Sequence, residues 1–346
     1  MAKDNTNDSY NFEDEVPSPN FSCVDFYQKR KKGKYRLTFA PDTQYKVADT
    51  HCHLEMFKNP EWPILRCALH NVPFLACVID STDDGPEAFD KVERAFEKAQ
   101  NMLPKIVEDI KNYGKQVDEP IIIKASDGSP KLCCNIDAIV DSPQMPKIKY
   151  IVGSHPHHSK DFDAQNLVEM LKHKDVACVG EIGLDYHYDL SPRDVQRKIF
   201  AEQLKIAREV KLPVALHLRE AHDDALKIFD EIGFDSEAGT LLHCFNLGKA
   251  ELKPWVEAGC YVAFGGPLTF KNSDATREAV SMVPADKLLT ETDAPFMTPE
   301  PLRGDTCFPD HVIFTADKLA EVTGNAQNKE AFYSQIYQNA LDLLDR

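Results

Sequence analysis

Residues 47–53, with the sequence VADTHCH, combine a strand-like pattern with side chains that bind metals. Side chains alternate between the two faces of a β-strand, so Asp49, His51 and His53 are predicted to point to one side. Two imidazoles two residues apart on one strand can reach the same cation. Since a histidine pair alone is weak support for a metal site, the prediction depends on what other segments bring to the same place.

Other histidines and carboxylates follow apolar, strand-like runs whose intervals also indicate the fold. Helix-like stretches separate most of these runs, and the clearest is 192–210, where apolar residues recur at helical spacing. Eight strands that alternate with helices predict an α/β fold, a parallel TIM-type (β/α)8 barrel. The predicted strands are residues 45–49, 72–79, 148–153, 176–182, 212–217, 239–243, 260–264 and 288–291.

Two segments are additions to this pattern. Residues 1–44 are predicted to form an N-terminal extension, partly flexible because its first half is rich in Asp, Asn, Ser and Pro, and residues 45–346 to form the barrel domain. The basic run 29–36 either contacts phosphates or forms a solvated turn between short strands, and we favour the turn.

The second addition is an insertion of about residues 106–147 between strands 2 and 3, expected to pack against the barrel after a helix at 86–103. Within it, the apolar runs 121–124 and 131–134 flank an Asp-Gly turn, which is typical of a β-hairpin. Beyond the eighth strand, two closing helices are predicted at residues 310–322 and 329–344.

In a TIM-type barrel the chemistry takes place at the C-terminal ends of the strands, which form the mouth of the barrel. A single histidine or acid there has an ordinary structural explanation as a hydrogen-bonding or ion-pairing group, but here several converge. Asp49 is expected to orient His51 by accepting a hydrogen bond. The predicted metal ligands are His51, His53, Glu181, His217, His243 and Asp293.

Six ligands exceed what one tetrahedral catalytic ion that also holds water can use, so they predict two divalent ions. Glu181 is the predicted bridge, because each of its two oxygens can bind one ion. His51, His53 and Asp293 would complete one ion, and His217 and His243 the other. Imidazole-rich ligation favours Zn, Mn, Fe or Co over Ca, and Mg or Mn are candidates for the working ions in the cell.

The chain has 346 residues, of which 42% are hydrophobic, and a formal net charge of −16, which argues against a broad basic surface for a polyanion. Bound cations would nevertheless reverse the sign of the charge inside a site. The sequence shows neither a long apolar span nor a signal-peptide core, and its ten cysteines have no repeated spacing. We therefore expect a cytoplasmic protein with reduced thiols, and we predict neither a membrane contact nor a protein partner.

Together these residues resemble the TatD family of metal-dependent deoxyribonucleases, within the amidohydrolase-like barrels. The resemblance runs from about residue 45 to the C-terminus and implies a TIM-type barrel, two divalent metals and hydrolysis of phosphodiester bonds in DNA. Many members have Arg-Asn-Glu-Pro after the eighth strand, whereas residues 303–309 here read RGDTCFP and lack the Asn-Glu pair. The similar segments are DTHCH (49–53), GEIGLDY (180–186), PVALHLR (213–219), LHCF (242–245), FGGPLT (264–269) and ETDAP (291–295).

The resulting hypothesis is a nuclease in which a water held between the metals loses its proton to Asp293 and attacks phosphorus, with Glu181 as the second catalytic carboxylate. His155, Arg219 and Arg303 are candidates for holding the phosphate, since arginine suits bidentate phosphate contacts.

Three alternatives stay open at this point. Arg219 could instead form a salt bridge with Glu220 or Asp223. The same binuclear site could serve a small-molecule amidohydrolase or lactonase, which should have a closed apolar pocket where a nuclease needs an open groove. A non-catalytic metal-binding protein is the third alternative, and the complete ligand set argues against it.

Overall fold

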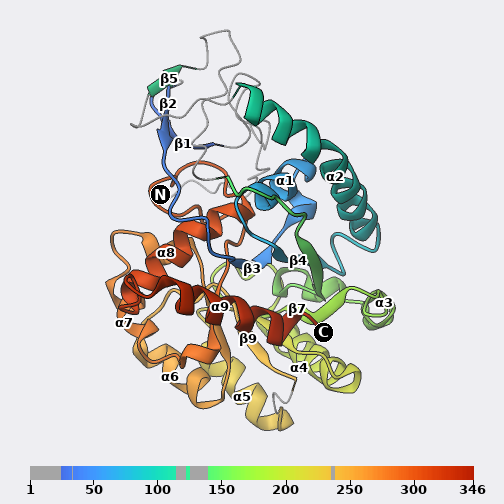
Figure 1. Ribbon diagram of the computed structural model, residues 1–346. Helices are drawn as coiled ribbons and strands as arrows, with labels where there is room; N and C mark the ends of the chain where they lie inside the picture. The colour runs from blue at the N-terminus through green and yellow to red at the C-terminus, as the bar shows by residue number, and fades with distance from the viewer. Residues whose placement is uncertain (1–24, 33, 114–121, 125–138, 235–237) are drawn as a thin grey trace.

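A barrel of eight parallel strands forms the centre of the computed structural model, which describes residues 25–32, 34–113, 122–124, 139–234 and 238–346 (Figure 1). Each of the eight predicted runs overlaps one of these strands, so the prediction of a TIM-type (β/α)8 barrel is confirmed. In order around the barrel they are β3 (Ala48–Cys52), β4 (Phe74–Asp80), β6 (Lys147–Gly153), β7 (Val176–Asp185), β8 (Val214–Arg219), β9 (Thr240–Leu242), β10 (Tyr261–Phe264) and β11 (Leu288–Thr290).

Helices follow the strands around the outside of the barrel, and the helices predicted at 192–210, 310–322 and 329–344 are present within two residues of those bounds. The helices are α1 (Glu61–Leu69), α2 (Glu87–Tyr113), α3 (Ala164–Met170), α4 (Arg193–Val210), α5 (His222–Ile232), α6 (Lys249–Glu257), α7 (Asp274–Val280), α8 (Val312–Val322) and α9 (Lys329–Leu344).

Helix α2 is longer than predicted. It was expected to end at residue 103, but it continues through Pro104 to Tyr113 and takes up the first part of the predicted insertion. An internal proline costs a helix roughly 3 kcal/mol. The apolar stripe of α2 continues beyond it, with Ile106 packed against the core and Ile110 buried, and this packing offsets the cost.

The barrel closes between its first and last strands, β3 and β11. Thr50 Oγ1 donates a hydrogen bond to the carbonyl of Thr290 (3.0 Å). Farther along, the backbone amide of Asp293 donates to the carbonyl of His51 (2.9 Å). The closure therefore places Asp293, which follows the last strand, beside His51 in the first strand.

The interior of the barrel is apolar below the mouth. Each of the eight strands contributes to one buried cluster that is separate from the layer between strands and outer helices, and among the described helices only α9 contributes to it. Because that cluster includes Leu343 and Leu344, α9 closes the N-terminal end of the barrel. Small strand residues such as Ala48, Ala215 and Ala263 leave room for this close packing.

A second, smaller sheet combines the N-terminal extension with the insertion. Strands β1 (Phe26–Arg30) and β2 (Lys34–Thr38) pair antiparallel around the basic run, as the favoured turn predicted, and β5 (Ile122–Lys124) pairs with β2. Figure 1 shows this sheet at the top, outside the barrel. The predicted partner of β5, residues 131–134, lies outside the described residues, so the hairpin within the insertion stays a prediction.

Phe26 anchors the extension to the barrel. Its buried ring lies 4.6 Å from the ring of His70 and 5.2 Å from that of Phe314. The guanidinium of Arg66 lies 4.9 Å from the ring centroid and donates a 3.0 Å hydrogen bond to the carbonyl of Asp25. The extension is thus held between α1 and α8, which belong to the barrel.

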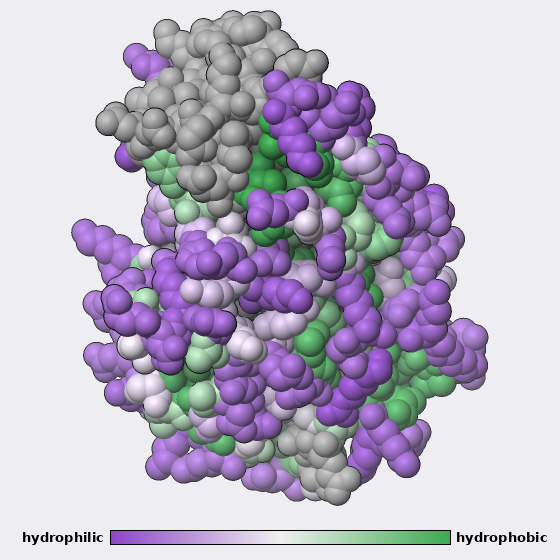
Figure 2. All heavy atoms as spheres, in the orientation of Figure 1, coloured by the Kyte–Doolittle hydropathy of each residue, from purple (hydrophilic) through white to green (hydrophobic). Residues whose placement is uncertain are grey.

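The face of the molecule in Figure 2 is mostly hydrophilic, and hydrophobic side chains gather on it over α1 and the end of α2. None of the helices in the described ranges combines the length and the apolar character needed to cross a membrane.

Replacement of Phe26 tests whether this anchor stabilises the fold. Phe26→Ala should lower the free energy of unfolding by roughly 3 kcal/mol, because it removes a fully buried ring and leaves a cavity. Urea unfolding measures the change. Gln28→Ala, two residues away on the same strand and half-buried, should change it by less than about 0.5 kcal/mol. Equal stability of the wild-type and Phe26→Ala proteins would show that the extension is not docked.

Candidate metal centre

The other five predicted ligands and His155 surround one buried carboxylate, that of Glu181 in β7, at the C-terminal ends of the strands. His51, Glu181 and His243 form a buried floor. The other four form a rim that reaches solvent, with side chains 13–18% exposed: His53, His155, His217 and Asp293.

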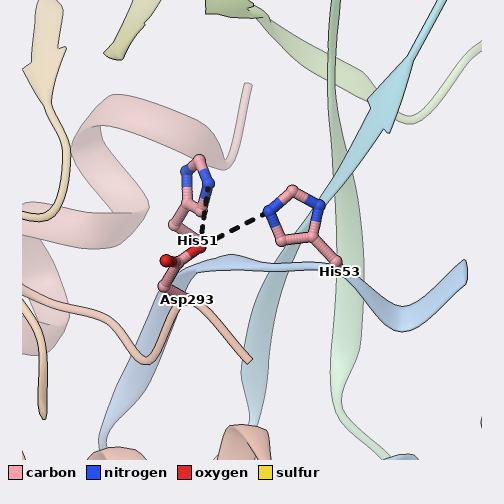
Figure 3. A group of neighbouring side chains, drawn as sticks. All are labelled: His51, His53 and Asp293. Atoms are coloured by element: carbon pink, nitrogen blue, oxygen red, sulfur yellow. Dashed lines mark ion pairs between the residues drawn. The ribbon is translucent and has the colours of Figure 1, made fainter. Parts of the chain in front are cut away.

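One oxygen of Glu181 faces the end of β3. Its Oε2 lies 3.3 Å from Nε2 of His51 and 3.8 Å from Nε2 of His53. Asp293 Oδ1 lies 3.8 and 3.5 Å from the same two nitrogens, and Figure 3 shows both rings turned toward this carboxylate. These atoms form the first predicted ligand group.

The other oxygen of Glu181 faces different strands. Its Oε1 lies 2.5 Å from Nδ1 of His217, 2.8 Å from Nε2 of His243 and 3.8 Å from Nε2 of His155. His155, which the sequence suggested only as a phosphate contact, thus lies among the possible ligands. Among the described residues, potential donor atoms within 4.8 Å of one another form three groups: His51, His53 and Asp293; His51, Glu181 and His243; and His155, Glu181 and His217.

Several buried atoms of this cluster lack hydrogen bonds within the described part of the chain. Both ring nitrogens of His51 are among them, although Nε2 lies near Glu181, and so is Nδ1 of His243. A buried polar atom without a partner costs about 1–3 kcal/mol. Imidazole and carboxylate donors are ligands that Zn and Mn accept, so a cation would satisfy these atoms and the residues present fit such an ion.

The charges of the cluster balance through neighbouring groups. Burial alone would raise the pKa of Glu181, but His243, His51 and His217 hold it well below its usual value. Burial would likewise lower the pKa of His243, yet Glu181 and Glu291 raise it well above normal. Without a metal cation, protonated imidazoles supply the positive charge around Glu181.

Three further carboxylates, which sequence reasoning did not assign, support the ligand histidines from behind. Glu55 Oε1 lies 3.3 Å from Nδ1 of His53, and Glu291 Oε1 lies 3.7 Å from Nδ1 of His243. Asp185 Oδ2 lies 3.2 Å from Nε2 of His217. Asp185 and Glu291 stand inside the quoted motifs, and Glu55 follows His53 by two residues, so their spacing was a usable signal.

Asp49 orients His51 in a different way from the one predicted. Its Oδ1 accepts from the backbone amide of His51 (3.3 Å), and its other contacts are with the amide and hydroxyl of Thr292 (2.9 and 2.5 Å). The strand register shifts between Asp49 and Cys52, so simple alternation does not describe this part of β3. Asp49 therefore fixes the backbone between β3 and β11, and not the imidazole ring.

The two predicted phosphate-binding arginines lie over aromatic rings. Arg219, at the end of β8, has its guanidinium carbon 4.7 Å from the ring centroid of Tyr188, and Arg303 lies 3.9 Å from that of Phe270. Neither has a carboxylate partner among the described residues. The alternative salt bridge of Arg219 is therefore not formed, and Glu220 pairs with His187 instead (2.8 Å).

Known proteins are similar to this chain in sequence and in fold. Residues 48–345 match the family described as TatD related DNase. The chain belongs to the TatD family. It is 41% identical to the uncharacterised metal-dependent hydrolase YabD of Bacillus subtilis, over 49% of this chain and 68% of that protein. It is 34% identical to the 3'-5' ssDNA/RNA exonuclease TatD of Shigella flexneri, over 43% and 59%.

Two solved structures share the fold of this TatD-family protein. The TatD homologue YJJV of Escherichia coli K12 superposes with a TM-score of 0.62 at 21% identity, covering 87% of this chain and 98% of its own. A TatD family hydrolase of Entamoeba histolytica gives 0.63 at 14% identity, with the same coverage. The resemblance read from the motifs is thus confirmed, and the protein is a metal-dependent hydrolase of this family.

The approach of β7 to β8 beside His217 gives a test of how the ligands are positioned. Gly183 has a φ of +149°, and a Cβ there would lie 2.0 Å from the carbonyl oxygen of His217. Gly183→Ala should lower the free energy of unfolding by about 1–3 kcal/mol and reduce the metal bound per chain, because the added methyl separates the strands. Urea unfolding and metal analysis measure the two effects.

Gly233→Ala is the matched control. Gly233 also has a positive φ (+57°), but a Cβ there meets nothing within 4 Å. It should cost only the backbone strain, about 1 kcal/mol, and leave the bound metal unchanged. The positioning role of the β7–β8 contact would be contradicted if both variants bound as much metal as the wild-type protein. It would also be contradicted if only Gly233→Ala lost metal.

Metal binding should depend on pH in a defined direction. Burial alone would lower the pKa of His53, but Asp293 and Glu55 raise it well above normal, and His243 behaves in the same way. Ligation needs neutral imidazoles, so Mn²⁺ or Zn²⁺ must displace protons, and affinity should increase as the pH rises through these elevated pKa values. Calorimetry in buffers of different ionisation enthalpy should show proton release near neutral pH. Affinity independent of pH between about pH 6 and 8 would contradict this account.

Proposed function

We propose that this protein is a nuclease that cleaves phosphodiester bonds in DNA, with two divalent cations held at the mouth of the barrel. The observation that carries the proposal is the division of Glu181, whose Oε2 faces one set of ligands and whose Oε1 faces another. The proposed ligands are His51, His53, Glu181, His217, His243 and Asp293, with His155 beside the second set.

A carboxylate divided in this way suits a bridge between two cations. Two-metal sites place their ions about 3.5–4 Å apart, a distance that one carboxylate can span with an oxygen on each. Mg, Mn and Zn are the proposed ions, because the donors are nitrogens and oxygens without a thiolate. When bound, such ions supply Lewis acidity, which lowers the pKa of water and neutralises charge on phosphate oxygens.

Asp293 is the proposed proton acceptor. Burial opposes its ionisation, but the hydrogen bond from His53 and the neighbouring imidazoles lower its pKa below the usual value, so it is a carboxylate at neutral pH. Its side chain is 15% exposed and therefore reaches the water of the mouth. A carboxylate in this position can take a proton from an attacking water.

His155, Arg219 and Arg303 are proposed to hold the phosphate. Each guanidinium lies over an aromatic ring, which orients its plane without neutralising its charge. The pKa of His155 is well below normal because of burial and the adjacent His217, so its ring is neutral and can donate one hydrogen bond.

The relatives support a nucleic-acid substrate. The matching family is described as DNases, and the Shigella flexneri relative is named for single-stranded DNA and RNA. The small-molecule amidohydrolase alternative has no greater support, because the four rim residues are all partly exposed where a closed apolar pocket was expected.

Digestion of a short single-stranded DNA with added Mn²⁺ or Mg²⁺ tests the proposal. The wild-type protein should cleave it, the chelated protein should not, and Asp293→Asn should be slower by about 100-fold or more, since a general base contributes at least that much. Asp286→Asn, an exposed acid at the opposite end of β11, should cleave at the wild-type rate. If all preparations leave DNA and RNA intact while two ions are bound, the nuclease proposal fails and the small-molecule hydrolase takes its place.

A further inference from the structure

Tyr188 is a large aromatic side chain displayed at the mouth of the barrel. It lies in the turn that follows β7, the strand that supplies Glu181, and its side chain is 54% exposed. The turn itself is fixed, because Asp185 Oδ1 accepts hydrogen bonds from the backbone amides of both His187 and Tyr188 (2.9 Å each). The ring is therefore exposed on a rigid support.

The neighbours of this ring orient it and leave much of it open. The guanidinium of Arg219 lies 4.7 Å from its centroid, while His157 and His187 meet it edge-on at 5.5 and 4.9 Å. Tyr186 of the same turn is a useful contrast, since its hydroxyl donates to Asp224 (2.6 Å). No such partner binds the hydroxyl of Tyr188 within the described residues.

The exposed ring is close to the candidate metal ligands. His157, which contacts the ring of Tyr188, has its Nε2 3.0 Å from Asp185 Oδ2. The same oxygen lies 3.2 Å from Nε2 of His217, whose other nitrogen lies 2.5 Å from Glu181. Tyr188 is thus separated from the ligand His217 by one imidazole and one carboxylate, so both could contact a single bound nucleotide.

We propose that Tyr188 and Arg219 form a subsite for an unpaired nucleobase beside the reacting phosphodiester, an inference that rests on the proposed nuclease function. Nucleobases of any identity stack on exposed aromatic rings. A neighbouring arginine guanidinium adds a cation–π contact to this stacking. A base inside a duplex is already stacked on both faces, so the subsite selects strands whose terminal bases are unpaired.

Binding measured apart from cleavage tests this subsite. The probe is a fluorescent single-stranded thymidine oligonucleotide, compared with the same strand made abasic, on the Mn²⁺-loaded protein carrying Asp293→Asn to slow cleavage. Tyr188→Ala should weaken binding of the intact strand about tenfold. The same substitution should weaken binding of the abasic strand much less, since that strand has no base to stack and is affected only through the orientation of Arg219.

Two further variants separate stacking from a general structural effect. Tyr188→Trp keeps an aromatic face and should bind the intact strand within about twofold of the parent protein. Leu190→Ala removes an equally exposed apolar side chain from the same loop, 56% exposed, and should change neither affinity.

The possible outcomes separate the subsite from the activity. Equal loss of affinity for intact and abasic strands, or no loss for either, would overturn the stacking subsite even if the wild-type protein cleaves DNA. Base-dependent binding through Tyr188 by a protein that cleaves nothing would retain the subsite and overturn the nuclease function. If the protein binds neither strand, both proposals fail.

Discussion

The burial of one carboxylate, Glu181, is the constraint on which the site depends. A buried charge is stable only when it is fully compensated, and here imidazoles from β3, β8 and the end of β9 converge on its two oxygens. The rings of His53, His217 and His243 are backed in turn by Glu55, Asp185 and Glu291. Carboxylates and imidazoles therefore alternate outward from the centre, which orients these three rings and leaves their inner nitrogens directed at a shared space suited to cations.

The barrel holds this polar cluster by separating it from the packing that stabilises the fold. Below the mouth the strands fill the interior with apolar side chains, and Leu343 and Leu344 of α9 close the far end. Around the mouth the strands approach so closely that Gly183 has no space for a side chain beside His217. Stability thus comes from one end of the barrel and chemistry from the other, as is usual for this fold.

Much of the fold and of the candidate site was predictable from the sequence, because it depends on local residue patterns. Eight apolar runs indicated the strands, and His, Glu and Asp at their ends indicated a candidate ligand set whose side chains lie around Glu181. Other features depend on distant segments. The register shift after Asp49 redirects that side chain. Strand β5 of the insertion pairs with β2 of the extension, far earlier in the chain, and no local pattern indicates that pairing. Packing also carries α2 past Pro104, a residue that by itself indicates a helix end.

An acidic protein can bind a polyanion when its positive charge is confined to one place. The chain as a whole has a net charge of −16, and near Glu181 the histidines balance carboxylates that are themselves buried. Arg219 ends β8 and Arg303 lies beyond β11. Neither has a carboxylate partner within the described residues, and each lies on an aromatic ring. With cations at Glu181, a phosphate bound there would meet local positive charge although the chain as a whole is acidic. The net charge of the chain therefore does not exclude a polyanionic substrate at this site.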